Sequence, residues 1–358
     1  MTRLAEDIAR EFGTPAVVID LDRVERNISR LQAACDAAGV ANRPHIKTHK
    51  SPQIAALQRN AGAKGITCQK LGEAEVMAAA GFDDVLISYN IMGEEKIARL
   101  AALTATARMT VCVDNPVSIA AAAEAARRGE RPVRVLVECD TGRKRAGVET
   151  AAEAVELARG IASHPGLEFG GFLLYPPETA FPQTQRFLDT ALAGVRADGL
   201  EPSIISTGGT PNVANLGKIA GATEHRAGTY VFNDRMMLAC GAATLDDCAL
   251  TVVATVVSRA APDRGIVDAG SKTLTSDTGG LEGHGLILEH PEAKIEKFAE
   301  EHGFLNLSAC NHRPEVGAVV RIIPNHVCVV VNMVDRLIAT RGDSIVGEIP
   351  VAARGRIV

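Results

Sequence analysis

A lysine in a short basic, histidine-containing segment is the first candidate for chemistry. Lys47 lies in the run Arg43-Pro44-His45-Ile46-Lys47-Thr48-His49-Lys50. A lysine at the end of a strand, beside other cations, can have the pKa of its ammonium group lowered, which makes the amine available for a Schiff base. The alternative is a solvated basic loop that precedes a helix, and Lys50 fits that description. On the pattern alone the two interpretations carry equal weight.

A turn of small residues is a candidate for binding phosphate. It is formed by Ser206, Thr207, Gly208, Gly209 and Thr210, just before a helix that is expected to start near Pro211. Backbone N–H groups, hydroxyls and a helix N-terminus together attract phosphate. An ordinary strand–helix turn carries similar glycines, so the signal is weak by itself. It is stronger after the seventh strand of a barrel, where phosphate often binds.

The third candidate is the pair His326 and Cys328, separated by Val327. This spacing within an expected strand places both side chains on one face. Imidazole and thiolate together suit Zn²⁺ best among the common ions, and two protein ligands leave positions for water or substrate. An isolated pair of this kind is more often a buried cysteine beside a half-exposed histidine.

Short β-rich runs alternate with Ala-rich stretches from residue 43 to about 235. The stretches 71–80, 115–128, 150–162 and 182–197 carry apolar residues at helical spacing. The expected strands are 44–47, 65–68, 85–88, 109–114, 133–140, 169–175, 203–207 and 224–232. Strands and helices repeated in this way predict a closed (β/α)8 TIM-like barrel, with an open doubly wound sheet as the rival.

The sequence pattern changes after about residue 240, where few segments have the apolar spacing of a helix. The expected strands here are 250–259, 265–268, 285–288, 318–323, 327–332 and 336–340, and only 291–301 is expected to be helical. The leading strand 15–20 is expected to join them. We therefore predict an α/β protein with a barrel over 21–239. Residues 1–20 with 240–358 would form a smaller C-terminal β-rich domain that carries the metal pair.

The candidate residues fall where the expected barrel strands end, which is where chemistry collects in this architecture. Lys47 ends the first strand, and Gln69 follows the second. The others lie at strands five to eight, namely Asp140, Arg145, Tyr175, the turn 206–210, Arg226 and Tyr230. This coincidence carries more weight than any single residue.

Composition narrows the function classes. The 358 residues are 46% hydrophobic and 23% charged, with a net charge of −5 and no basic block, which argues against nucleic acid as a partner. No apolar run approaches the roughly 20 residues of a membrane helix. The first 13 residues contain no apolar signal core, so a cytoplasmic protein is expected. Eight scattered cysteines fit reduced thiols.

Taken together, the sequence resembles the fold-type III pyridoxal-phosphate enzymes of alanine-racemase-like architecture. Within them it is similar to the D-threonine aldolase and D-serine dehydratase family, over nearly the whole chain from Thr14 to Arg354. The motifs are RPHIKTHK (43–50), ECDTGRKRAG (138–147), STGGTP (206–211), RAGTYVFND (226–234), DAGSK (268–272), EEHG (300–303) and PNHVC (324–328).

The resemblance implies roles for the candidate residues. Lys47 would bind pyridoxal phosphate covalently, Arg145 would lie near the phenolic oxygen of the cofactor, and Arg226 would face its pyridine nitrogen. A permanent cation there disfavours protonation of that nitrogen. The other cofactor-binding residues would be Gln69, Tyr175, Ser206, Thr207, Gly208, Gly209, Thr210 and Tyr230. His326 and Cys328 would bind a divalent metal, with zinc favoured and manganese or magnesium as alternatives.

The implied activity is that of a lyase acting on a D-3-hydroxy amino acid. Dehydration of D-serine or D-threo-3-hydroxyaspartate, with release of ammonia, is slightly favoured, because the His-x-Cys pair and the RPHxKT form look closer to the dehydratases. Aldolases of the D-threonine type, which give glycine and an aldehyde, more often carry His-x-Asp and a phosphate turn richer in glycine. The choice between these two reactions stays open.

Two further functions are compatible with the sequence. An amino-acid racemase needs no metal and would leave the His-x-Cys pair structural. A pyridoxal-phosphate-binding homeostasis protein, which is not an enzyme, resembles the barrel alone, so the added β-rich domain argues against it. The resemblance also implies a homodimer, in which the β domain of one subunit helps to close the barrel mouth of the other.

Overall fold

The computed structural model describes residues 2–358, so of the predicted segment 1–20 only Met1 lies outside the described residues. The chain forms two compact units. Unit 1 contains the chain up to Ser29, Thr48–Gln53 and Thr229–Arg354, and unit 2 contains Arg30–Lys47, Ile54–Gly228 and Gly355–Val358. Each unit is therefore assembled from segments that are far apart in the sequence. The predicted division of function between 21–239 and 240–358 stays a prediction.

Unit 2 is built on an eight-stranded parallel sheet. Its order is β2 (Ala41–Asn42), β9 (Glu224–Arg226), β8 (Ile204–Gly208), β7 (Leu167–Leu174), β6 (Val133–Cys139), β5 (Arg108–Val113), β4 (Asp84–Ile87) and β3 (Ile66–Cys68). A bridge between His45 and Thr67 joins the segment after β2 to β3. The sheet thus closes on itself, which confirms the predicted barrel.

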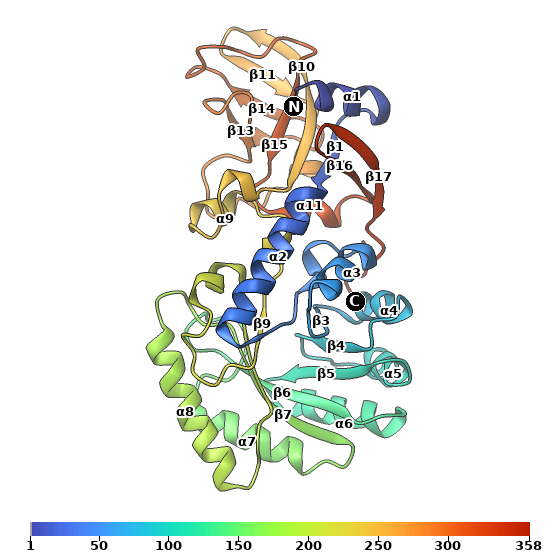
Figure 1. The fold of residues 1–358 in the computed structure, drawn as a ribbon, viewed down its shortest axis with the longest axis vertical. Coiled ribbons are helices and arrows are strands. Elements are labelled where there is room, and N and C mark those ends of the chain that lie inside the picture. The colour runs from blue at the N-terminus through green and yellow to red at the C-terminus, as the bar shows by residue number, and fades with distance from the viewer. Residues whose placement is uncertain (1) are drawn as a thin grey trace. The chain divides into compact units, whose positions relative to one another are not determined.

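Helices follow the barrel strands and pack their apolar faces on the sheet. They are α4 (Leu71–Ala79), α5 (Glu94–Leu103), α6 (Pro116–Arg128), α7 (Ala151–Ala162) and α8 (Phe181–Ala197), and Figure 1 shows α5 and α6 beside β5. Local chemistry starts them where the sequence predicts. Asn115 accepts a hydrogen bond from the N–H of Ser118 at the start of α6, and Thr150 forms a capping box with Glu153 at α7.

Three positions around the barrel differ from the prediction. Lys47 lies on the short 3-10 helix η1 (Ile46–Thr48) rather than in a strand. The segment after the phosphate-turn candidate is the 3-10 helix η2 (Thr210–Asn215), not an α-helix. The last strand, β9, ends at Arg226, so Tyr230 lies on η3 (Thr229–Val231), which belongs to unit 1.

Unit 1 contains a nine-stranded mixed sheet. Its strands are β1 (Ala16–Asp20), β10 (Leu250–Ala261), β11 (Arg264–Val267), β12 (Leu286–Ile287), β13 (Lys294–Phe298), β14 (Gly303–Asn306), β15 (Val319–Ile323), β16 (Arg336–Arg341) and β17 (Ser344–Pro350). The long β10 pairs first with β1 and β15 and then with β11 (Figure 1). The predicted C-terminal β-rich domain, joined by the leading strand, is confirmed.

Besides η3, the helices that lie wholly in unit 1 are α1 (Thr2–Phe12), α9 (Arg235–Ala239), η4 (Leu245–Asp247), α10 (Ser271–Leu274) and α11 (Val327–Asn332). All of them except α1 are shorter than two helical turns. Helix α1 packs Ala5 and Ile8 against Val253 and Ile338 of the sheet. Two expectations for this unit are wrong, because 327–332 is a helix instead of a strand and the expected helix 291–301 contains strand β13.

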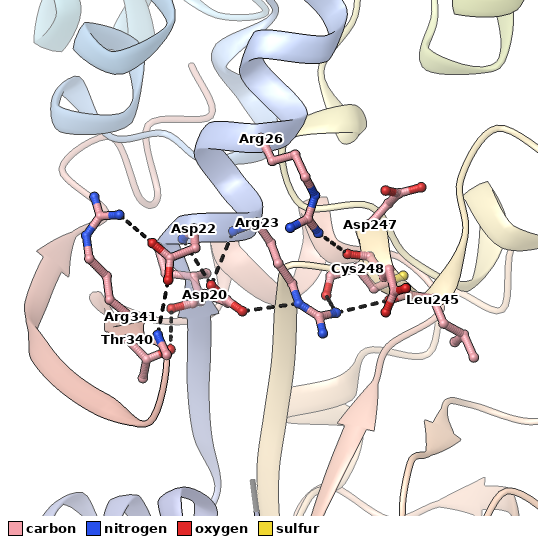
Figure 2. Close-up of polar contacts among 12 residues, drawn as sticks. Asp20, Asp22, Arg23, Arg26, Leu245, Asp247, Cys248, Thr340 and Arg341 are labelled. Atoms are coloured by element: carbon pink, nitrogen blue, oxygen red, sulfur yellow. Dashed lines mark hydrogen bonds and ion pairs between the residues drawn. The ribbon is translucent and has the colours of Figure 1, made fainter.

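Two helices begin in unit 1 and end in unit 2, α2 (Leu21–Ala38) and α3 (Pro52–Asn60). The start of α2 is fixed by charged side chains of unit 1 (Figure 2). Asp20 accepts hydrogen bonds from the N–H groups of Asp22 and Arg23. The guanidinium of Arg23 donates to two carbonyl oxygens near η4, and Arg341 of β16 donates to Asp22.

Among the described residues, no helix has the length and apolar character to cross a membrane.

Candidate active site

Lys47 follows directly on the segment that closes the barrel. On one side of this segment the N–H of His45 donates to the carbonyl of Ala227, and on the other side the N–H of Thr67 donates to the carbonyl of Pro44. The N–H of Lys47 itself donates to Nδ1 of His45 over 3.4 Å. The main chain at Lys47 is thus tied to the C-terminal edge of the barrel, and the lysine is half-buried there.

Gln69 lies beside His45 at the same edge. Its Oε1 is 3.2 Å from Nε2 of His45, and its Nε2 donates to the carbonyl of Ser88. Because Oε1 can only accept, His45 carries its proton on Nε2, which agrees with Nδ1 accepting from Lys47. His45 is part of the motif around Lys47, yet sequence reasoning assigned it no role. The structure makes it the link between Lys47 and Gln69.

The loop after β6 is shaped by Asp140. Its carboxylate accepts the N–H groups of Gly142, Arg143 and Arg145 at 2.7 to 2.8 Å, and these bonds hold its pKa below the usual value even though burial opposes the shift. Three donors on one carboxylate give the loop a defined course. This course places Arg145 with most of its side chain exposed.

Tyr175 follows β7, and the guanidinium groups of two arginines lie over its ring. The guanidinium of Arg143 lies 4.0 Å from the ring centroid and that of Arg145 lies 5.7 Å from it. Arg145 Nη2 is also 3.5 Å from Oε1 of Glu138, whose pKa is raised by burial. The structure therefore brings the predicted residues Arg145 and Tyr175 together and adds Arg143, which the sequence did not single out.

Arg226 is buried inside the barrel. Its Nε donates to Ser206 Oγ over 3.1 Å, and Nη2 donates to the carbonyl of Leu174 over 2.9 Å. Ser206 Oγ in turn donates to Glu224 Oε1 over 2.6 Å. Burial lowers the pKa of Arg226, while the charges of Glu224 and Glu138 oppose that shift. These bonds fix the direction of the guanidinium.

Several polar groups of the turn 206–210 are already hydrogen-bonded to the neighbouring strand β9. The N–H of Gly209 donates to the carbonyl of Arg226 over 2.7 Å, and the hydroxyl of Thr207 lies 3.1 Å from His225 Nδ1. The turn therefore offers a phosphate fewer hydroxyl and N–H groups than the sequence predicts. Gly209 has φ of +100°, and a Cβ there would lie 2.2 Å from the Tyr175 ring. Only glycine leaves this space beside Tyr175 open.

The unit 2 residues fit a phosphorylated aldehyde cofactor. They combine a lysine, an arginine fixed inside the barrel mouth and a glycine turn that leaves space beside an aromatic ring. These are the groups required to bind an aldehyde, a ring nitrogen and a phosphate.

In unit 1, His326 and Cys328 come together at the start of α11. His326 is the N-cap residue of this helix, and its side chain is hydrogen-bonded to that of Cys328. The predicted pairing on a strand face is thus wrong, because the residues meet across a helix start. The bond with Cys328, and a second with Asp277, raise the pKa of His326 to about 9.

Asp277 orients this histidine. Its Oδ2 lies 2.6 Å from Nδ1 of His326, which leaves Nε2 as the ring nitrogen for a metal ion. Metal-binding histidines usually pair their other nitrogen with a carboxylate or carbonyl in this way. Asp277 was missed by sequence reasoning, since an aspartate 49 positions from its partner carries no local signal.

The surroundings of Cys328 are polar. Its sulfur lies 3.2 Å from Thr48 Oγ1 and 3.9 Å from Thr229 Oγ1. The buried Asp234 accepts the N–H of Val327 over 3.1 Å, and burial raises the pKa of Asp234 to about 6. The residue that contacts the candidate metal ligand, Thr48, is joined by one peptide bond to Lys47.

An imidazole nitrogen and a thiol in contact fit a zinc-type ion that also takes non-protein ligands. Within residues 2–358, no group of three or more His, Cys, Asp or Glu side chains is arranged to hold a metal ion. A site built on His326 and Cys328 would therefore be an open one. The remaining predicted residue, Tyr230, is buried in unit 1.

Comparison with known proteins accounts for both units. A family described as "Alanine racemase, N-terminal domain" matches residues 19–236, and one described as "Putative serine dehydratase domain" matches 249–340. The D-threonine aldolase of an Arthrobacter species is 35% identical over 98% of this chain and 94% of its own length. The D-threo-3-hydroxyaspartate dehydratase of Delftia sp. HT23 is 34% identical over 90% of this chain and 93% of its own length.

Solved structures agree. The D-threonine aldolase from Filomicrobium marinum superposes with a TM-score of 0.89 at 34% identity, covering 96% of both chains. The Delftia dehydratase superposes with a TM-score of 0.87 at 32% identity, covering 95% of this chain and 98% of its own. Two further structures are mutants of a D-threo-3-hydroxyaspartate dehydratase in which a histidine or a cysteine, two positions apart, is replaced, and the cysteine mutant was solved in a metal-free form.

Proposed function

Because the chain belongs to the alanine-racemase-like family that includes D-threonine aldolase and D-threo-3-hydroxyaspartate dehydratase, we propose that it is a pyridoxal-phosphate- and divalent-metal-dependent lyase for D-3-hydroxy amino acids. The observation that carries the proposal is the contact between His326 and Cys328, with Asp277 behind the histidine. A racemase has no need of such a pair. The metal distinguishes the two activities.

When bound, pyridoxal phosphate withdraws electrons from the bonds at the substrate α-carbon, and the divalent ion acts as a Lewis acid on the β-hydroxyl. Lys47 would hold the cofactor covalently through its amine. Arg226, fixed by Ser206 and the carbonyl of Leu174, would keep a positive charge at the pyridine nitrogen. Arg145 would lie at the phenolic oxygen and contribute a second cation.

In unit 1, His326 Nε2 and the Cys328 sulfur would hold the metal. Asp277 keeps the imidazole in one orientation, and the hydroxyl of Thr48 lies against the sulfur. Zinc is the ion that this donor pair favours, with manganese or magnesium as alternatives.

Within this class we favour dehydration to a keto acid and ammonia over cleavage to glycine and an aldehyde. The specific support is the metal pair. A D-threo-3-hydroxyaspartate dehydratase has been solved as mutants of a histidine and of a cysteine at the spacing that His326 and Cys328 have here. Aldol cleavage is the second candidate, favoured by the 35% identity to the Arthrobacter aldolase.

Product analysis tests the proposal. Purified protein is loaded with pyridoxal phosphate and zinc and incubated separately with D-serine, D-threonine and D-threo-3-hydroxyaspartate. We expect keto acid and ammonia, with the L-enantiomers inert. Glycine with an aldehyde would instead establish the aldolase.

A chelator arm separates the lyase from the racemase alternative. Removal of the metal should abolish product formation, and zinc should restore it. Interconversion of D- and L-amino acids that continues in the chelator would contradict the lyase proposal and establish a racemase. Binding of the cofactor without turnover of any amino acid would instead favour the homeostasis-protein alternative. The homodimer and the cytoplasmic location stay predictions.

A further inference from the structure

Asn325 directly precedes His326 and is almost fully buried in unit 1, with 1% of its surface exposed. Its Nδ2 donates to the carbonyls of Thr278 and Gly283, over 3.3 and 2.8 Å. Its Oδ1 accepts a hydrogen bond from Arg235 Nη1 over 2.7 Å. Carbonyl oxygens only accept and a guanidinium only donates, so these partners fix the orientation of the amide and use both of its N–H groups.

The loop 277–283 is held by Asn325 near both of its ends, through the two carbonyls just named. Arg235 holds the same loop at a third carbonyl, that of Glu282, to which Nη1 and Nη2 each donate over 3.2 Å. The side chains of Asn325 and Arg235 are also bonded to each other. The main chain of the loop is therefore fixed by two side chains that support one another.

Asp277 lies in this loop and binds His326 through a partly exposed side chain. The Asp277 side chain is 44% exposed, and its Oδ2 lies 2.6 Å from Nδ1 of His326. Its Oδ1 accepts the N–H of Gly279 over 3.0 Å. Gly279 and Gly280 both have positive φ, and glycines lose more conformational freedom on ordering than other residues do. A carboxylate in such a loop keeps one direction only if the main chain that carries it is held.

One short segment thus supplies both the histidine and the anchor of the loop. Asn325 binds the main chain of the loop, and the adjacent His326 binds the side chain of Asp277. A shift of the loop away from Asn325 would therefore also disturb the contact between Asp277 and His326. All of these residues belong to unit 1.

We propose that Asn325 is a positioning residue of the metal site. It holds the loop 277–283 in place, and the loop in turn presents Asp277 to His326. The inference rests on the proposed function, because the ion is the one assigned to His326 and Cys328. Asn325 does not touch the ion in this assignment and acts only through the loop.

Asn325→Leu tests the assignment, because leucine has nearly the shape of asparagine but donates no hydrogen bond and adds no charge. The readout is the zinc affinity of the purified protein after metal removal, measured by competition with a chromogenic chelator. We expect the Kd for zinc to rise about tenfold, which is the lower end of the range for loss of a residue that supports a metal ligand. The affinity for pyridoxal phosphate should not change.

Glu282→Ala is the matched control in the same loop. The Glu282 side chain is 82% exposed and forms an ion pair with Lys294, whereas its main-chain carbonyl is the group that Arg235 binds. The substitution removes the ion pair and keeps the carbonyl. Since exposed ion pairs contribute little, the Kd for zinc should stay within about twofold of the wild type.

A double-mutant cycle separates positioning from a general structural effect. If Asn325 acts through Asp277, the two substitutions remove the same interaction. In an Asp277→Asn background, Asn325→Leu should therefore change the Kd for zinc by less than about twofold. The visible spectrum of the cobalt-substituted protein is the second readout, and it should change in Asn325→Leu and in Asp277→Asn but not in Glu282→Ala.

Equal weakening of zinc binding in the two backgrounds, or none in either, would overturn the inference while the wild type still binds zinc. A wild type that binds no zinc would overturn the metal role in the proposed function, and the inference with it. Should Asn325→Leu fail to fold, Asn325→Ser is the second variant. Its hydroxyl is too short to bond both carbonyls, so the Kd should rise in the same Asp277-dependent way, and an unchanged Kd would overturn the inference.

Discussion

Asp277 Oδ2 lies 2.6 Å from Nδ1 of His326, so a loop carboxylate orients the histidine that we assign to the metal. Loss of such a partner typically lowers metal affinity 10- to 100-fold. We expect Asp277→Asn to weaken zinc binding by a factor of that order and to leave pyridoxal phosphate affinity unchanged. Competition with a chromogenic chelator measures the first quantity, and absorbance titration measures the second. Unchanged zinc affinity would remove Asp277 from the site.

The role of Cys328 as a metal ligand is tested by replacing its soft sulfur with a methyl group or with a hard oxygen ligand. Cys328→Ala should release the metal, keep the bound cofactor and lose lyase activity. Cys328→Asp supplies a hard oxygen ligand, so it should shift the preference from zinc toward manganese or magnesium and regain activity with those ions. Activity of each variant is measured after metal removal and titration with single ions. A Cys328→Ala protein that is fully active in chelator would make the pair structural.

The covalent lysine is tested by chemical trapping. Borohydride reduction of the loaded protein should fix the cofactor on Lys47, and peptide mass spectrometry locates it. Two other lysines serve as internal controls. Lys50 has φ of +51° and is buried, and Lys272 is paired with Glu301. Label recovered on either of them would contradict the assignment.

The two arginines of the proposed cofactor site should separate activity from stability. The Arg145 side chain is 61% exposed, so Arg145→Ala should change the free energy of unfolding by no more than about 0.5 kcal/mol while it lowers kcat. Arg226 is buried and bonds Ser206 and the carbonyl of Leu174, so Arg226→Ala should also cost about 1–3 kcal/mol of stability. Urea denaturation and steady-state kinetics measure both. A destabilised Arg145→Ala that keeps full kcat would make Arg145 structural.

The burial of His225 makes stability depend on pH. Its pKa falls from 6.5 in the unfolded chain to about 4 in the folded protein, so the unfolded state binds more protons below pH 6.5. This contribution to stability is complete above pH 6.5 and decreases as the pH falls toward 4. Between pH 7 and pH 5 we expect a loss of about 2 kcal/mol from this residue. Urea denaturation of the apoenzyme at both values, with His225→Gln as the reference, isolates the effect. An equal loss in the variant would assign it to other groups.

Most of the barrel could be predicted from the sequence because local and tertiary preferences agree there. Asn115 and Thr150 start helices that the apolar spacing continues, and the strands between them are short runs of apolar residues. In unit 1 the preferences conflict. Val327–Asn332 is rich in β-branched residues, which favour a strand. The buried Asp234 accepts the N–H of Val327 and thereby starts a helix there.

The residues that we propose for the site could be named one by one from the sequence, but the contacts between them could not. Lys47, His326 and Cys328 stand in recognisable motifs. The partner that orients His326 does not, because Asp277 acts through a contact that only the folded chain creates. The i, i+2 spacing predicted that His326 and Cys328 lie close together on one face of a strand. They do lie close together, but at the start of helix α11. Contacts at a helix cap depend on tertiary structure and leave little trace in a periodic pattern.

Strand β1 has a consequence for how the protein is made. Its neighbours in the sheet are β10 and β16, so Val18 pairs with Thr251 on one side and Ile338 on the other. A ribosome that adds about 5–20 residues per second needs on the order of tens of seconds between the first of these strands and the last. Until β10 has been synthesised, β1 is an apolar segment without a partner strand on the growing chain. We therefore expect chaperone binding during translation to centre on Ala16–Asp20, and the native sheet to form only when synthesis is nearly complete.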